Sequence, residues 1–242
     1  MQGTGGGMQE SILIVGTAGH ARVVADIVEK EGRYRIAGFV DQSSPPGSRF
    51  LDYRVLGTEE EIPGLAARSG VCGGIIAVGD NWTRFQIAQR IRAVLPHFRF
   101  LCAVHPSAAI GSSAVLGDGT VVMARSVVNP KCRVGEFCII NTRASLGHDC
   151  RVAEFACLLP NATVGGNVTI GRLSVIALGA KLIHGIHVGE QTVIGAGSTV
   201  VRDVPPFVVA YGTPARVIRQ RKAGDPYLAL KSAQTPINAV SA

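Results

Sequence analysis

The adjacent pair His148-Asp149 is the strongest candidate for catalysis in the sequence. A histidine beside a carboxylate can act as a general base near neutral pH, because its charge changes in that range. His148 comes two residues after an aliphatic position of a six-residue repeat. Other residues in the same phase are charged: Asp118, Glu136, Glu154, Arg172 and Glu190. This phase therefore points outward, which favours a reactive histidine, with an ordinary surface histidine as the alternative. His184, 36 residues later, shares the face but lacks a carboxylate neighbour.

The glycine-rich turn from Gly16 to His20 is the second candidate site. It follows an apolar run at residues 11–15 and precedes a helical pattern at residues 21–31. Backbone N–H groups at such a helix start attract phosphate, and Ala18 and Gly19 lie at that point. The turn is not the GxGxxG fingerprint, so a plain tight turn remains an equal alternative.

Further candidates follow other predicted strands of the first hundred residues. Apolar runs at residues 11–15, 36–40 and 74–78 alternate with helical patterns, which predicts a small parallel α/β domain of Rossmann-like type. Ligands of such sheets bind beyond the carboxyl ends of the strands. Asp41, Gly79 and Asn81 lie at such ends. Asp41 could accept hydrogen bonds from a base or a ribose, or it could cap a turn.

A hexapeptide repeat dominates the chain after residue 100. Aliphatic residues recur at every sixth position, at Val104, Ile110, Leu116, Val122, Val128, Val134, Ile140, Leu146, Val152, Leu158, Val164, Ile170, Ile176, Leu182, Val188, Ile194 and Val200. A small residue usually stands two positions earlier, and glycine often follows and supplies freedom where the chain turns. This period predicts a parallel β-helix with three hexads, about 18 residues, in each coil.

Composition narrows the function classes. The chain has 242 residues, a net charge of +7, 47% hydrophobic and 5% aromatic residues. No apolar run approaches the ~20 residues that span a bilayer, so we expect no membrane insertion. The basic residues are scattered, which favours a phosphate-rich small ligand over nucleic acid. The six cysteines form no CxxC pair, so we expect buried thiols in the cytoplasm and no metal.

The predicted organisation has four parts. Residues 1–10 are Gly-rich and polar, unlike a signal peptide, and are expected to be disordered or derived from an expression vector. Residues 11–100 form the α/β domain, 101–206 the β-helix and 207–242 a C-terminal tail. Outward apolar residues leave a face that needs covering, at Ala109, Val115, Val121 and Val127. That face predicts a homotrimer.

Together the hexads, Gly16-x-x-Gly19-His20 and Asn141-x(6)-His148-Asp149 resemble a known family. It comprises sialic-acid O-acetyltransferases and sugar-nucleotide 4-amino N-acetyltransferases of bacterial glycan biosynthesis. The resemblance spans about residues 11–219 and implies a left-handed β-helix, a trimer, acetyl-CoA between neighbouring β-helices and a nucleotide sugar on the N-terminal domain.

The resemblance also implies roles for single residues. His148 matches the catalytic base and Asp149 the acidic neighbour that orients it. The nucleotide-sugar pocket is matched by Ala18, Gly19, His20 and Asp41, and the acetyl-CoA groove by Gly166, Leu178 and Ala196. Gly16, Gly79 and Asn81 are added to the predicted substrate-binding residues by their place at strand ends. Cys157 stands where the family commonly has a second histidine that contacts the thioester. A thiol is a weak donor, so polarisation of the thioester there is in question.

The resulting hypothesis is an acetyl-CoA-dependent N-acetyltransferase acting on a nucleotide-linked amino sugar, with uridine or guanosine as the base. One alternative is O-acetylation of a free sugar such as sialic acid. Another is a non-catalytic scaffold in glycan assembly, for which loss of the second histidine at Cys157 would argue. His148 and Cys157 are half a coil apart, so a site that contains both must lie at a subunit interface.

Overall fold

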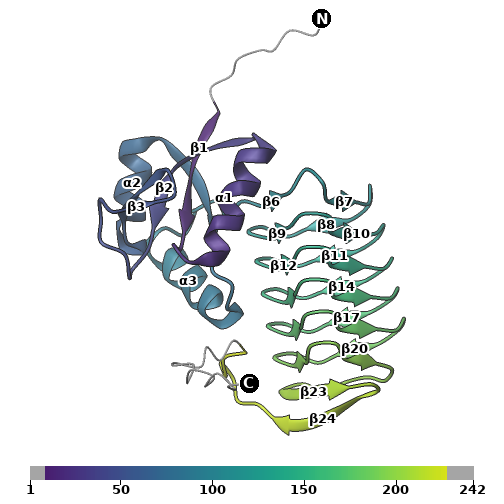
Figure 1. The fold of residues 1–242 in the computed structure, drawn as a ribbon. Coiled ribbons are helices and arrows are strands. Elements are labelled where there is room, and N and C mark those ends of the chain that lie inside the picture. Colours follow the sequence, from purple (N-terminus) through teal and green to yellow (C-terminus); the bar gives the residue numbers. More distant parts are fainter. Residues whose placement is uncertain (1–8, 228–242) are drawn as a thin grey trace, which may run out of the picture.

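The structure, a computed structural model, describes residues 9–227 of the chain, and the predictions for residues 1–8 and 228–242 lie outside them. An α/β domain lies against one side of a left-handed parallel β-helix, as the sequence predicts (Figure 1). The elements of the α/β domain are β1 (Glu10–Val15), α1 (Gly19–Glu31), β2 (Tyr34–Val40), β3 (Arg49–Phe50), β4 (Tyr53–Gly57), the 3-10 helix η1 (Glu59–Glu61), α2 (Ile62–Ser69), β5 (Val71–Ile76) and α3 (Asn81–Val94).

The sheet of this domain has the strand order β3-β4-β2-β1-β5. Its pairs are parallel except β3–β4. Alternate residues of β1 enter two cores, because successive side chains of a strand point to opposite faces. Ile12 and Ile14 pack with α1, whereas Leu13 and Val15 pack with α2 and α3. The three predicted strands are therefore present, with helices on both faces.

The boundaries differ from the prediction in one region. The strand predicted at residues 74–78 is β5, which starts and ends earlier, and residues 51–70, without a predicted element, contain β4, η1 and α2. Gly73 and Gly74 weaken the strand signal, since glycine is a poor strand former. Both are required by packing: a side chain on Gly73 would collide with the backbone of Arg99, and one on Gly74 with Leu13.

The β-helix consists of two-residue strands, each containing one aliphatic residue of the repeat. They are β6 (Ala103–Val104), β7 (Ala109–Ile110), β8 (Val115–Leu116), β9 (Val121–Val122), β10 (Val127–Val128), β11 (Arg133–Val134), β12 (Ile139–Ile140), β13 (Ser145–Leu146), β14 (Arg151–Val152), β15 (Cys157–Leu158), β16 (Thr163–Val164), β17 (Thr169–Ile170), β18 (Val175–Ile176), β19 (Lys181–Leu182), β20 (His187–Val188), β21 (Val193–Ile194) and β22 (Thr199–Val200). From Val122 onward these aliphatic residues form one buried core.

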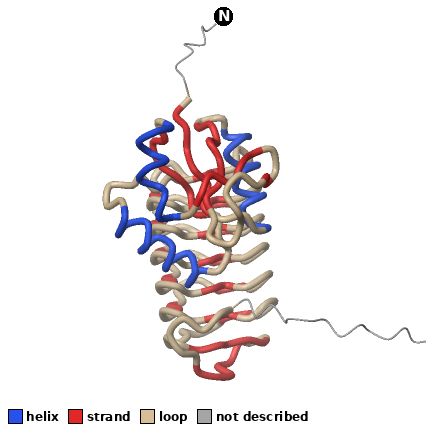
Figure 2. The backbone as a smooth tube through the Cα atoms, turned by 90° about the vertical axis from the view of Figure 1, so that its left-hand side faces the viewer, coloured by secondary structure: helices blue, strands red, loops and turns tan. Residues whose placement is uncertain are grey.

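The strands stack into three parallel sheets, which define three faces. Face 1 contains β6, β9, β12, β15, β18 and β21; face 2 contains β7, β10, β13, β16, β19 and β22; face 3 contains β8, β11, β14, β17 and β20. The turns between them form the 1–2 edge, the 2–3 edge and the 3–1 edge. Figure 2 shows the coils of the β-helix stacked along one axis.

The glycines after the aliphatic positions have a different role from the predicted one. Gly147 and Gly165 are not among the residues with positive φ, whereas Asp149 (φ 59°) and Asn167 (φ 58°) are. The left-handed turn position is thus filled by another phase of the repeat. A Cβ on Gly165 would lie 2.6 Å from the backbone nitrogen of His184 in the next coil. These glycines are needed for close approach between coils.

The α/β domain covers face 1. Val121, Ile139 and Cys157 of this face share a core with α1. Val121 was expected on an uncovered outward face, but it is buried because the chain's own domain lies over it. Val115 on face 3 is 51% exposed. Of the other outward apolar residues singled out in the sequence, Ala109 is exposed and Val127 is half-buried.

After Val200 the chain adds β23 (Val208–Gly212) and β24 (Ala215–Gln220). β23 extends face 1, parallel to β21, and pairs with β24 in an antiparallel hairpin. Both strands lie in the segment 207–242 that the sequence describes as a tail. Beyond β24 the described chain, drawn in yellow in Figure 1, returns toward the α/β domain, where the Tyr227 hydroxyl donates to the Gly79 carbonyl.

Candidate active site

His148 and Asp149 lie in the turn between β13 and β14, on the 2–3 edge. The Nδ1 atom of His148 is 2.8 Å from Oδ2 of Asp149, and the two side chains are 64% and 40% exposed. A carboxylate on Nδ1 fixes the orientation and tautomer of the ring. The Nε2 atom is thereby left to take a proton from a substrate.

Gly166 supports the ring of His148 from the next coil. It belongs to the same edge, because Ser145 of β13 pairs with Thr163 of β16. A Cβ on Gly166 would lie 2.7 Å from Nε2 of His148, so any larger residue would displace the imidazole. The predicted base and this predicted cofactor residue are therefore neighbours. His184 follows one coil further along the same edge and is exposed.

The turn after β1 leaves the N-terminus of α1 open. Gly16 has φ +108°, and its N–H donates to the Val40 carbonyl at 2.8 Å. Ala18 is the N-cap of α1 and supplies no side-chain cap, and the first turn carries no acidic residue. Gly19 is exposed, with open space around its Cβ position. Uncapped N–H groups at a helix start are suited to a phosphate.

Asp41 lies beside this turn at the end of β2. Its carboxylate accepts hydrogen bonds from the hydroxyl of Thr17 at 2.8 Å and from the N–H of Ser43 at 2.7 Å. Burial alone would raise its pKa, but these hydrogen bonds outweigh burial and lower it. The carboxylate is thus kept ionised and fixed in position.

A cavity of about 220 Å³ opens beside Asp41. Its lining also includes Glu59 and Arg90, whose Oε2 and Nε atoms are 2.9 Å apart. Gln42 donates to the same carboxylate oxygen at 2.7 Å. The sequence did not indicate Glu59, because it lies in the unassigned region before α2. The cavity offers ionic and hydrogen-bonding groups to a polar ring or ribose.

His20 and Asp80 hold buried polar atoms without partners among the described residues: Nε2 of His20 and Oδ2 of Asp80. Burial, and then the nearby charge of Arg84, lower the pKa of His20 to about 4. The imidazole is therefore neutral at pH 7. The Oδ1 atom of Asp80 caps α3 through the N–H of Thr83 at 2.8 Å. Buried unpaired atoms at strand ends indicate places for a ligand's polar groups.

Asn81 and Arg84 join the domain to the β-helix. The Asn81 amide donates to the Leu173 carbonyl at 2.7 Å and is buried, so it faces the 3–1 edge. Arg84 is 1% exposed and donates to the carbonyls of Phe137 at 2.9 Å, Val78 at 2.8 Å, Gly79 at 3.0 Å and Phe155 at 3.3 Å, and to Sγ of Cys157 at 3.1 Å. We call this set of contacts the Arg84 latch.

The sequence contained one signal for this latch. Arg84 lies in line with the apolar positions Ile87, Ala88 and Ile91 of α3, all of which are buried. A charged residue on the apolar stripe of a helix needs buried partners. Three of these partners, Phe137, Phe155 and Cys157, lie 53 to 73 residues further along the chain, which no local pattern could reveal.

Cys157 is fully buried on face 1, and its Sγ belongs to the Arg84 latch. Its predicted contact with a thioester stays a prediction. Leu178 and Ala196 lie at the 1–2 edge, one coil apart, and both are exposed. Gly166, the other predicted cofactor residue, lies at the 2–3 edge. The predicted acetyl-CoA residues are therefore divided between two edges of one β-helix.

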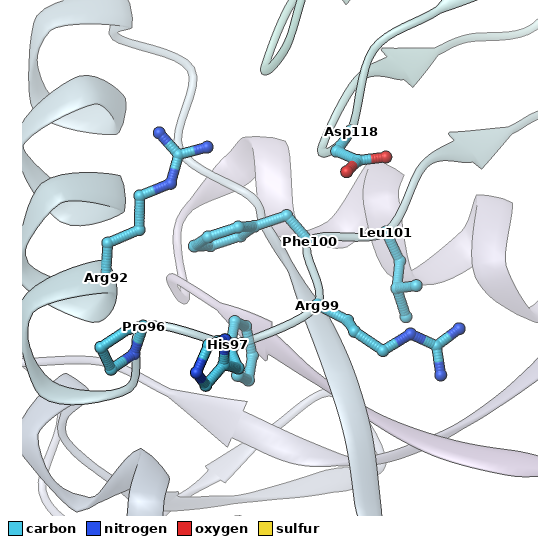
Figure 3. Close-up of a pocket in the computed structure, with 8 residues that line it drawn as sticks. Arg92, Pro96, His97, Arg99, Phe100, Leu101 and Asp118 are labelled. Carbon is cyan, nitrogen blue, oxygen red and sulfur yellow. The ribbon is translucent and has the colours of Figure 1, made fainter.

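A separate hollow of about 360 Å³ lies at the linker between the domains (Figure 3). Arg92 of α3 projects toward Phe100 of the linker there, with its guanidinium carbon 5.5 Å from the ring centroid. Arg92 also pairs with Glu136 at 2.6 Å. Its cation is thus used in holding the two domains together, and none of the predicted site residues lines this hollow.

The two halves of the predicted site lie on different sides of one chain. The turn at Gly16–His20 and the loop at Gly79 belong to the domain on face 1, whereas His148 lies at the 2–3 edge. Figure 1 shows the domain beside β6, β9 and β12, with β11 and β14 on the far side. One chain alone does not bring the predicted base to its own predicted nucleotide pocket.

Comparison with known proteins places the chain in a family. The PglD N-terminal domain family matches residues 11–91. PerB from Caulobacter crescentus, in complex with CoA and GDP-perosamine, is 34% identical with a TM-score of 0.81, covering 88% of this chain and 99% of that one. A mutant of perosamine N-acetyltransferase from the same organism, with the same two ligands, is 33% identical with the same TM-score and coverage. The acetyltransferase domain of PglB from Neisseria gonorrhoeae, with acetyl coenzyme A, is 31% identical with a TM-score of 0.79, covering 87% and 100%.

A curated relative, UDP-N-acetylbacillosamine N-acetyltransferase of Bacillus subtilis, is 34% identical over 115 residues. The match covers 48% of this chain and spans about half, 52%, of that relative. The full-length matches to solved structures show that the chain belongs to the family of hexapeptide-repeat N-acetyltransferases of nucleotide-linked amino sugars. The predicted family is confirmed.

None of the helices within residues 9–227 combines the length and apolar character that crossing a bilayer requires. No three His, Cys, Asp or Glu side chains in this part of the chain are grouped so as to hold a metal ion.

Proposed function

We propose that the protein transfers the acetyl group of acetyl-CoA to the amino group of a nucleotide-linked amino sugar, giving an N-acetylated sugar donor for glycan biosynthesis. The observation that carries the proposal is the His148–Asp149 pair, exposed on a β-helix whose α/β domain holds an open helix N-terminus. Full-length relatives that bind CoA together with GDP-perosamine support it.

The reaction follows from these groups. The sugar amine attacks the thioester carbonyl, so that a C–N bond forms and the C–S bond breaks. Nε2 of His148 accepts the proton that the amine loses and returns it to the departing CoA sulfur, while Asp149 holds the ring. Backbone N–H groups are suited to stabilising the oxyanion between the two steps.

The nucleotide end of the substrate would occupy the α/β domain. The open N-terminus of α1 at Ala18 and Gly19 suits the diphosphate. Asp41 and the cavity beside it suit the ribose or the base. The neutral imidazole of His20 offers a buried Nε2 to the sugar end. One relative is named for a UDP-linked sugar and another is solved with a GDP-linked sugar. The test therefore includes both a uridine and a guanosine nucleotide sugar.

A homotrimer would complete the site. His148 of one subunit would meet the nucleotide pocket of its neighbour, because the two lie on different sides of one chain. Exposed apolar residues lie on the edges that would meet: Leu178 at the 1–2 edge, and Ile183 and Val201 at the 2–3 edge. Acetyl-CoA would then lie between Gly166 of one subunit and the Leu178–Ala196 edge of another.

We place this reaction in the cytoplasm. All six cysteines are free thiols, and burial raises the pKa of Cys138 to about 12 and that of Cys150 to about 11. Unreactive core thiols suit a reducing compartment.

The direct test is release of CoA thiol with three acceptors: a UDP-linked 4-amino sugar, GDP-perosamine and free sialic acid. We expect turnover with at least one nucleotide amino sugar and an amide product by mass spectrometry. Turnover with sialic acid alone would replace N-acetylation by O-acetylation. Turnover with none would favour the scaffold hypothesis.

Mixed trimers test the shared site. Gly19→Phe should fold, because the Cβ position is open, but should block the nucleotide pocket. His148→Ala should remove the base. Each variant alone is expected to be inactive, and an equal mixture refolded together should recover roughly a quarter of the wild-type activity if neighbouring subunits supply the two halves. No recovery would place the whole site within one chain.

A further inference from the structure

The described C-terminal segment forms a strap, residues 221–227, that is anchored to the last coils. The N–H of Arg221 donates to the Phe207 carbonyl at 2.7 Å, and its Nη1 donates to the Gln191 carbonyl at 2.7 Å. The N–H of Gly224 donates to Oε1 of Gln191 at 3.2 Å. Because Gln191 lies at the 3–1 edge, these contacts direct the strap along that edge toward the α/β domain.

The strap then touches the first turn of α3. Gly224 has φ +78°, and a Cβ there would lie 2.8 Å from the ring of Trp82. Glycine is thus required twice, by the backbone conformation and by the indole. Trp82 is the single tryptophan of the chain, so its fluorescence reports whether the strap is docked.

Tyr227 ends the described strap at the loop after β5. Its hydroxyl donates to the Gly79 carbonyl at 2.8 Å, and its ring packs against the core that α1 shares with Cys157. The Gly79 carbonyl also accepts from Nη1 of Arg84 at 3.0 Å. The loop is therefore held by two donors, one from its own domain and one from the strap.

This loop is the part of the domain that faces the proposed substrate. Val78 lines the cavity beside Asp41, and the unpartnered Oδ2 belongs to Asp80. The Cβ atom of His20, whose Nε2 is also unpartnered, would be 3.9 Å from a Cβ on Gly79. Fixing Gly79 thus fixes the spacing between the two unpaired polar groups.

We propose that Tyr227 is a positioning residue for the nucleotide sugar: the strap carries its phenol to Gly79, and the clamped loop presents His20 and Asp80 to the sugar end of the substrate. The proposal rests on the proposed function. Burial raises the pKa of Tyr227 above its usual value, so that it stays a donor throughout the working pH range.

The test uses steady-state kinetics of the full chain with a UDP-linked 4-amino sugar and with GDP-perosamine. Tyr227→Ala should raise KM for the accepted nucleotide sugar by ~10-fold, with kcat and KM for acetyl-CoA within about 2-fold, because a hydrogen bond and an aromatic contact are lost. Tyr227→Phe keeps the ring and should raise that KM by only about 3-fold. Tyr53→Phe, whose phenol donates to Glu29 at 2.8 Å, is the matched control and should change nothing.

A second pair of variants, Gly224→Ala and its control Gly32→Ala, tests the position of the strap while leaving Tyr227 in place. Gly224→Ala should shift the Trp82 emission and raise KM for the nucleotide sugar as Tyr227→Ala does. Gly32→Ala carries similar backbone strain at φ +67° without a collision, and should leave emission and KM unchanged. An unchanged KM despite a shifted emission would overturn the proposal, as would a lower KM or equal increases in both KM values.

Failure of the proposed function is seen separately. If the wild type acetylates neither nucleotide sugar, the proposed function fails. The role of Tyr227 in binding is then tested by calorimetry with the same two nucleotide sugars. Weaker binding to Tyr227→Ala than to Tyr53→Phe would support the clamp. Equal binding, or binding to none of the variants or the wild type, would overturn it.

Discussion

The 2–3 edge of the β-helix and the junction between its domains contrast in what surrounds their polar groups. At the edge, His148 and Asp149 form a pair with each other and are otherwise largely open to solvent. At the junction, Arg84 is buried and each of its contacts is to another part of the same chain. The polar groups of the edge are therefore accessible to another molecule, whereas those of the junction bind other parts of the same chain and stabilise the fold.

The contrast separates chemistry from positioning. A proton-accepting group must be reachable, and the proposed base lies in an exposed turn whose coil is fixed by strands on both sides. A nucleotide pocket must keep its loops in place, and the domain proposed to hold it is fastened through buried hydrogen bonds. If this division is right, substitutions at the edge will change rate without changing stability, and substitutions at the junction will change stability first.

The largest effect is expected at the edge. His148→Ala should lower kcat by ~10²- to 10³-fold through loss of the general base. The midpoint of thermal unfolding and the Kd for acetyl-CoA should stay close to wild type, since the side chain is 64% exposed. His184→Ala, on the same edge, is the control and should retain most of the activity. If His148→Ala kept half of the wild-type kcat, His148 would not be the general base.

Arg84→Met is expected to have the next largest effect. The substitution keeps much of the side-chain volume but leaves the carbonyls of Phe137 and Phe155 without this donor. We expect a loss of about 3 kcal/mol in the free energy of unfolding. At fixed protein concentration the thermal midpoint should fall by ~6–12 °C. Exposed Arg68→Met on α2 is the control; an equal midpoint in both variants would mean that the latch holds nothing.

The same contrast explains what could be predicted from the sequence. The β-helix was predictable almost residue by residue, because each coil makes the same demand for an inward aliphatic residue, from Val104 to Val200. The exposure of His148 was predictable because its phase in that repeat is outward, whereas its role as a base stays a prediction. Repetition supplied the signal in both cases.

The junction was not predictable, because its contacts join residues that are far apart in the chain. The position of Arg84 on the apolar stripe of its helix indicates that it has buried partners but not which they are, and Glu59 lies in a stretch without periodicity. Tyr227 reaches Gly79 across 148 residues. Burial of Val121 likewise depends on which face the domain covers, and the hexapeptide pattern is the same for all three faces.

His20 provides a pH test of the junction. Its pKa is about 4 in the folded chain against an ordinary value of 6.5. Between these values the unfolded chain binds a proton that the folded chain does not, so this contribution to stability is present above pH 6.5 and is lost as pH falls toward 4. Between pH 7.5 and 5 the loss should be about 2 kcal/mol.

His20→Asn removes this dependence. Its thermal midpoint should fall by ~4–8 °C less than that of the wild type between the two pH values, by scanning calorimetry. His97→Asn, at an exposed position, should follow the wild-type curve. Parallel curves for the wild type and both variants would show that His20 is protonated as freely in the fold as outside it.

The smallest effect is expected at Cys157, which belongs to the junction although the sequence predicts a contact with the thioester. If its thiol contacts the thioester, or forms an acetyl-enzyme with His148 of a neighbouring subunit, it must be reachable. In the described chain it is fully buried and accepts a hydrogen bond from Arg84. Cys157→Ala should therefore cost only about 1 kcal/mol of stability, for a small cavity and one weak acceptor.

The rate should hardly respond to the same change. We expect kcat of Cys157→Ala within about 3-fold of wild type, because direct amine attack needs no intermediate on the enzyme. Mass spectrometry after mixing the wild type with acetyl-CoA alone should find no acetyl adduct on Cys157, with partly exposed Cys72 as the internal comparison. An adduct on Cys157, together with a large loss of kcat in the alanine variant, would mean that the junction opens during catalysis. Cys157 would then be both a buried residue of the junction and a reactive group, and the division between the two regions would be wrong at this one residue.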